Sequence, residues 1–248
     1  MNGGITVAGL SKRYGPVTAV DKLTFTVEPG QVTGFLGPNG AGKTSTLRML
    51  LGLVAPTEGS ALIGGDRYAD LREPRREVGA VLEATGFHPG RSGRDHLRVL
   101  AAEAGIPPGR VAAVLSQVGL DGAAGRRVRG YSLGMRQRLG LAAALLGDPG
   151  VLILDEPGNG LDPAGLAELR DVLRGLAADG RTILMSSHVL SEVAQTVDRV
   201  IIIAGGTLRF AGPLGELTGV HGETLEAAFL RLTADRSRQD GAIAPAGN

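Results

Sequence analysis

The eight residues GPNGAGKT, from Gly37 to Thr44, constrain the fold of this chain more than any other feature. They match the pattern G-x-x-x-x-G-K-[S/T] and stand between the β-rich run QVTGFL and a segment, TSTLRMLLGL, whose apolar residues recur at helical spacing. Glycines let such a loop turn its backbone N–H groups toward phosphate oxygens at the start of the following helix. The sequence therefore predicts a phosphate-binding loop between a strand and a helix, in an α/β fold.

The side chains of this loop point to a nucleotide and Mg²⁺ as its ligands. Lys43 would bring a compact positive charge to the β- and γ-phosphates, and the Thr44 hydroxyl can ligate Mg²⁺. The predicted nucleotide-binding residues form one continuous run: Gly37, Pro38, Asn39, Gly40, Ala41, Gly42, Lys43, Thr44 and Ser45.

A second motif, VLILDEP, is an apolar strand that ends in two adjacent acids, Asp155 and Glu156. Taken alone, Asp-Glu-Pro fits a simple turn as well as a site. Beside a phosphate loop the acidic pair indicates a site more specifically. Adjacent strand residues point to opposite sides of a sheet, so the two acids can have different roles. Asp155 would hold Mg²⁺, directly or through water, and Glu156 would take the proton from an attacking water.

With this acidic pair the chain resembles the ATP-binding cassette (ABC) family, and the resemblance covers almost the whole chain. YSLGMRQRLGLAAALL is similar to the family's signature segment, which implies that Ser132 and Gly134 face the ATP bound by a second protomer. Leu133 stands where the family most often has Gly, and Met135 where it often has Gln. The same stretch also fits the hydrolase pattern G-x-S-x-G, but RRVR precedes it where that pattern needs an apolar strand.

The resemblance gives roles to four further residues. Asp162 in GNGLDP resembles the key residue of the family's dimer-contact loop, and His188 in SSHVL resembles its γ-phosphate sensor. Tyr14 in SKRYG resembles the aromatic residue on which adenine stacks, although an exposed loop tyrosine is the alternative. Glu83 follows the strand VGAVL where most members have Gln; it would be a further Mg²⁺ ligand, or else a surface acid at a strand end.

The implied fold is a P-loop NTPase of ABC type with a RecA-like core, a small antiparallel β subdomain at the N-terminus and an inserted helical subdomain. Alternating strands and helices after Val151 fit parallel βαβ units in the core. Three short β-rich runs, 5–10, 22–27 and 31–36, predict the largely antiparallel start.

The predicted domain limits follow from the change in pattern along the chain. Helical patterns dominate the middle, so we expect the helical subdomain at about 86–148. One ATPase domain would span 1–232, and the last segment, 233–248, would form a disordered tail because it has few apolar residues.

Composition narrows the possible partners and location. Cysteine is absent, so disulfides, thiolate metal sites and cysteine nucleophiles are impossible. A net charge of +1 and 3% aromatic residues give no general attraction to nucleic acid, and no nucleic-acid partner is expected. The N-terminus has no secretory-signal pattern, and the longest apolar runs fall short of the ~20 residues that span a bilayer. We therefore expect a cytoplasmic chain.

The resemblance implies an ATP-hydrolysing subunit that powers an ABC transporter, peripheral on the inner face of the cell membrane. Its partners would be separate membrane-spanning subunits and a second ATPase protomer, bound head to tail in a homo- or heterodimer. The chain most resembles ATP-binding subunits of bacterial exporters for drugs, antibiotics or peptides. Three segments carry this resemblance: SKRYG, YSLGM and ETLEAAFLRL.

Two other functions stay open. A cytosolic ABC-type ATPase acting on ribosomes or DNA would have two cassettes or a long coiled coil, and this chain has one cassette with a short stretch between Lys43 and Gly130. A scaffold that binds ATP without hydrolysing it is opposed by the presence of Lys43, Asp155 and Glu156.

Overall fold

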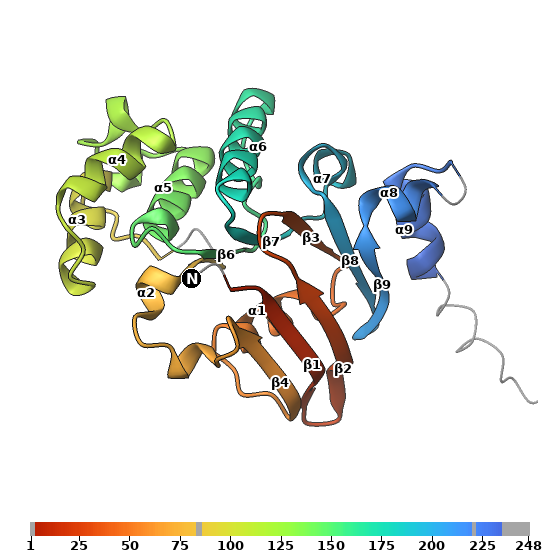
Figure 1. Ribbon diagram of the computed structural model, residues 1–248. Helices are drawn as coiled ribbons and strands as arrows, with labels where there is room; N and C mark the ends of the chain where they lie inside the picture. The colour runs from red at the N-terminus through yellow and green to blue at the C-terminus, as the bar shows by residue number, and fades with distance from the viewer. Residues whose placement is uncertain (1–2, 83–85, 220–221, 235–248) are drawn as a thin grey trace, which may run out of the picture.

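Two β-sheets form the frame of the computed structural model, which describes residues 3–82, 86–219 and 222–234 (Figure 1). The smaller sheet is antiparallel, and its strand β1 (Ile5–Tyr14) lies between β2 (Val17–Val27) and β4 (Glu58–Ile63). Residues along β1 alternate between buried and exposed at its start, as expected of a sheet with one face against a core. This sheet is the antiparallel subdomain that the sequence predicts.

The larger sheet has six strands in the order β5-β6-β7-β3-β8-β9. All neighbouring pairs are parallel except β8 and β9, which are antiparallel. The strand bounds are β3 (Val32–Leu36), β5 (Val78–Val81), β6 (Val151–Leu154), β7 (Thr182–Ser186), β8 (Arg199–Ala204) and β9 (Thr207–Pro213).

One strand lies elsewhere than predicted. The run 31–36 was assigned to the antiparallel start, and that assignment is wrong, because β3 pairs in parallel with β7 and β8 inside the larger sheet. Every residue of β3 is buried. A half-exposed strand alternates regularly between polar and apolar residues, whereas a strand covered on both faces does not. QVTGFL lacks a sustained alternation of this kind.

The larger sheet separates two hydrophobic cores. Successive side chains of β6 point to opposite faces, so Leu152 and Leu154 pack with the helices, whereas Val151 and Ile153 pack with the smaller sheet and α1 (Lys43–Leu50). The sheet therefore lies between a helical layer and a layer made of the smaller sheet with α1.

The helices form two groups (Figure 1). Those inserted between β5 and β6 lie together at one end: α3 (Gly93–Glu103), α4 (Gly109–Gln117) and α5 (Leu133–Leu145). The second group comes from the chain after β6: α6 (Pro163–Ala178), α7 (Leu190–Thr196), α8 (Leu214–Gly219) and α9 (Leu225–Thr233). The short helix α2 (Pro74–Glu77) directly precedes β5. The first group is the helical subdomain that the fold prediction includes.

The domain limits themselves stay predictions. The expected tail begins at 233, but Thr233 is still the last residue of α9, and 235–248 lie outside the described residues. No helix in the described ranges combines the length and the apolar composition needed to cross a membrane.

Candidate functional site

The predicted phosphate loop connects β3 to α1 and borders an open hollow of about 500 Å³. Two of its glycines are required by close approach: a Cβ on Gly42, where φ is 100°, would lie 2.4 Å from the carbonyl oxygen of Ala19, and one on Gly37 would lie 2.5 Å from that of Ile203. The residues around the hollow are Tyr14, Ala19, Asn39, Gly40, Ala41, Gly42, Lys43, Thr44, Ser45, Asp155 and Glu156. The fold thus gathers most of the predicted nucleotide and metal residues in one place.

Lys43 lies near the end of this loop and is the first residue of α1. Its side chain is 9% exposed, and Nζ donates hydrogen bonds to the carbonyl oxygens of Gly37 at 2.5 Å and Pro38 at 3.3 Å. Burial lowers the pKa of Lys43, and the negative charges of Glu156 and Asp155 act in the opposite direction. The loop therefore holds a positive charge next to the two acids.

Asp155 and Thr44, which the sequence predicts as metal ligands, lie in contact. Thr44 Oγ1 donates to Asp155 Oδ2 at 3.1 Å, which brings two oxygen ligands together at the start of α1. Among the described residues, no three His, Asp or Glu side chains form a metal cluster by themselves. Mg²⁺ usually takes one or two protein ligands and completes its shell with phosphate oxygens and water, so this pair suits it.

Glu156 and His188 also lie together at this end of the sheet. His188 Nδ1 is 2.7 Å from Glu156 Oε2, and the His188 backbone N–H donates to the same oxygen at 3.3 Å. Glu192 on α7 is close enough to interact with both: burial raises the pKa of Glu192, the charge of Glu156 raises it further, and His188 lowers it. The carboxylate of Glu156 is thus held in one position beside the hollow.

Ser186, which the sequence analysis did not select, connects the two acids. It is fully buried at the last position of β7. Its Oγ donates to Asp155 Oδ1 at 2.5 Å and accepts the backbone N–H of Glu156 at 2.9 Å. A signal was present in the sequence, because Ser186 ends a buried strand just before the selected His188.

Ser132, Gly134 and Asp162 line a different hollow, which contains none of the phosphate-loop residues. Ser132 is the N-cap of α5, where its Oγ accepts the N–H of Met135 at 3.2 Å, and Asp162 caps α6 through the N–H of Gly165 at 2.8 Å. Within one chain, therefore, these residues do not join Lys43 at one site. Their role toward a second protomer stays a prediction.

Tyr14 borders the first hollow and is 46% exposed. Lys12, which the sequence analysis passed over, has its Nζ 5.1 Å from the ring centroid and donates to the carbonyl oxygen of Ala55 at 2.7 Å. The predicted metal ligand Glu83 lies outside the described residues.

The contacts of Ser186 lead to a stability prediction. In Ser186→Ala the buried N–H of Glu156 loses its acceptor and Asp155 loses a donor, so the free energy of unfolding should fall by about 1–3 kcal/mol. Ser187→Ala is the matched control, since it removes only the acceptor of the Val189 N–H and should cost about 0.5–1.5 kcal/mol. Urea denaturation measures both, and an unchanged free energy for Ser186→Ala would contradict the assigned network.

Comparison with known proteins identifies the family. The family model described as ABC transporter matches residues 20–159, a range that includes the phosphate loop, the signature segment and the acidic pair. A structure of the ATP-binding subunit of an ABC transporter superposes with a TM-score of 0.84 at 29% identity, over 92% of this chain and 98% of that one. A dimeric bacterial ABC transporter cassette shares the fold, with a TM-score of 0.75 at 22% identity over 84% and 98% of the two chains.

Characterised relatives agree with this match. The chain is 45% identical over 207 residues to the bacitracin transport ATP-binding protein BcrA of Bacillus licheniformis, which covers 82% of this chain and 68% of the relative. It is 37% identical over 204 residues to the lantibiotic transport ATP-binding protein SrtF of Streptococcus pyogenes, covering 82% and 88%. The chain therefore belongs to the ABC transporter family, as one of its ATP-binding cassettes.

Proposed function

We propose that this chain hydrolyses ATP to power an ABC transporter that exports an antibiotic, a drug or a peptide. Hydrolysis is supported by one observation: the phosphate loop, the Thr44–Asp155 pair and Glu156 border the same hollow, and His188 contacts Glu156. A scaffold that only bound ATP would not need a carboxylate fixed by an imidazole beside the phosphate loop.

In this proposal the loop N–H groups and Lys43 bind the β- and γ-phosphates, and the ring of Tyr14 stacks on adenine. Thr44 and Asp155 would hold Mg²⁺, which neutralises charge that develops on the phosphate oxygens. Glu156 accepts the proton of the attacking water.

His188 has a role that depends on the proton of Glu156. While Glu156 is a carboxylate, Nδ1–H of His188 donates to it, and a neutral imidazole then has an acceptor at Nε2. Once Glu156 carries the proton from water, its O–H can donate to Nδ1 if His188 changes tautomer, with Nδ1 losing its proton to solvent and Nε2 gaining one from solvent. The His188 side chain is 60% exposed, which allows this exchange, and Nε2–H is then a donor. In the proposed mechanism His188 would therefore stabilise the leaving phosphate after the base has acted.

The role of Glu156 gives a direct test. Glu156→Gln keeps the size of the side chain but removes the base, so ATP should still bind while turnover falls by roughly 10²- to 10⁴-fold. Steady-state hydrolysis and equilibrium binding of ATP measure the two effects, with the exposed Glu28→Gln as control. Turnover close to that of the wild type would exclude Glu156 as the base.

The separation of the two hollows supports a site shared by two chains. Lys43→Ala and Ser132→Arg should each inactivate a homodimer, but a mixture should regain part of the activity, because some heterodimers have one intact site. Cross-linking first verifies that heterodimers form. A mixture that contains them and stays as inactive as either parent would show that each chain works with its own Ser132.

Export and membrane partners are proposed from the relatives that transport bacitracin and lantibiotics. We expect the chain to stay at the inner face of the membrane and to co-purify, in mild detergent, with separate membrane-spanning subunits. Cells lacking it should be more susceptible to such peptides, and the wild-type gene, but not Glu156→Gln, should restore resistance. Recovery with ribosomes instead, together with unchanged susceptibility, would favour the translation alternative.

A further inference from the structure

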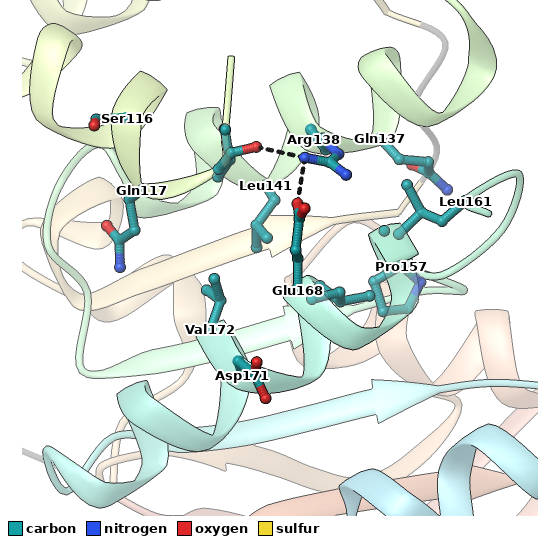
Figure 2. A pocket seen from close by; sticks show the side chains of 14 residues that line it. Ser116, Gln117, Gln137, Arg138, Leu141, Pro157, Leu161, Glu168, Asp171 and Val172 are labelled. Carbon is teal, nitrogen blue, oxygen red and sulfur yellow. Dashed lines mark hydrogen bonds and ion pairs between the residues drawn. The ribbon is translucent and has the colours of Figure 1, made fainter. Parts of the chain in front are cut away.

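Gln137 is a buried polar residue to which the proposed reaction gives no role. It lies on α5, is 8% exposed, and lines a hollow between α5 and α6. Figure 2 shows it at the side of this hollow where Pro157 and Leu161 also lie. Its Nε2 donates a hydrogen bond to the backbone carbonyl oxygen of Glu156 at 3.0 Å, so a residue of the helical subdomain contacts the residue proposed as the base.

The backbone of Glu156 needs such contacts because its conformation is unfavourable. Its φ is 51°, in the left-handed region that residues other than glycine rarely adopt. Three hydrogen bonds fix it: the N–H donates to Ser186, and the carbonyl oxygen accepts from both Gln137 and the N–H of Asn159 at 3.1 Å. Gln137 makes the one bond of the three that comes from the helical subdomain.

The carbonyl half of the Gln137 side-chain amide is placed unfavourably. Its Oε1 is buried and has no hydrogen-bond partner in the part of the chain that the structure describes. Burying an unpaired carbonyl oxygen costs free energy, so an apolar residue of similar size would pack here at lower cost. The donor bond to Glu156 is what distinguishes glutamine from such a residue.

We infer that Gln137 is a positioning residue that fixes the backbone of Glu156 and so sets the place of its carboxylate for hydrolysis. This inference rests on the proposed function. It also connects the two parts of the proposed shared site, because α5 begins at Ser132 and Gln137 lies on the same helix. A shift of α5 would then reach Glu156 through a single hydrogen bond.

The test replaces the donor and keeps the length of the side chain. In Gln137→Met, kcat should fall roughly 3- to 10-fold, as expected for the loss of one hydrogen bond, with the affinity for ATP unchanged. Gln117→Met is the matched control, because Gln117 is exposed at the end of α4 and lines the same hollow (Figure 2). It should leave kcat unchanged.

A double mutant separates positioning from packing. If Gln137 acts through Glu156, Gln137→Met should lower the residual single-turnover rate of Glu156→Gln by much less than it lowers that of the wild type. An equal decrease in both backgrounds would overturn the inference. Should Gln137→Met fail to fold, Gln137→Leu serves instead, since it also lacks a donor and brings no charge into the buried site.

Amide hydrogen exchange tests the same contact without hydrolysis. Exchange over 156–161 should be faster in Gln137→Met than in the wild type and Gln117→Met, because the carbonyl of Glu156 loses an anchor. Unchanged exchange would overturn the inference even if the chain hydrolysed no ATP. Absence of hydrolysis in the wild type, in contrast, would contradict the proposed function alone.

Discussion

The parallel pairing of β6, β7 and β3 is the constraint on which the candidate site depends. Strands that run in the same direction end at the same edge of a sheet, so the segments that follow them meet there. The phosphate loop follows β3, the acidic pair follows β6, and Ser186 with His188 marks the end of β7. Residues separated by more than a hundred positions in the chain thus become neighbours because backbone hydrogen bonds align three short buried strands.

At this edge, hydrogen bonds from neutral donors hold Asp155 and the backbone of Glu156, and a cation lies nearby. Thr44, Asp155, Ser186 and the backbone of Glu156 form one continuous chain of hydrogen bonds. The cation of Lys43 lies near enough to the two acids that their charges oppose the effect of burial on its pKa. A site arranged in this way has its dipoles in place, so little reorganisation is needed when charge moves during a reaction.

Local patterns in the sequence predicted the phosphate loop, the acidic pair and the two kinds of sheet, because each depends on a few consecutive residues. The run 31–36 was misplaced, since its neighbours in the sheet come from distant parts of the chain. Ser186 could have been found from its position at a strand end. Gln137 could not, because its role exists only once α5 packs beside the turn after β6.

The N-cap of α5 shows how one hydroxyl can serve two partners at once. Ser132 Oγ uses a lone pair to accept the N–H of Met135, which leaves its hydrogen free to be donated elsewhere. Helix capping alone ranks serine, threonine and aspartate as near equals. An anion near this position, as proposed for the ATP of a second protomer, would separate them, because the hydroxyls still offer a proton whereas aspartate would bring a repelling charge. In the proposed shared site, hydrogen-bond polarity rather than helix stability would therefore favour serine at this position.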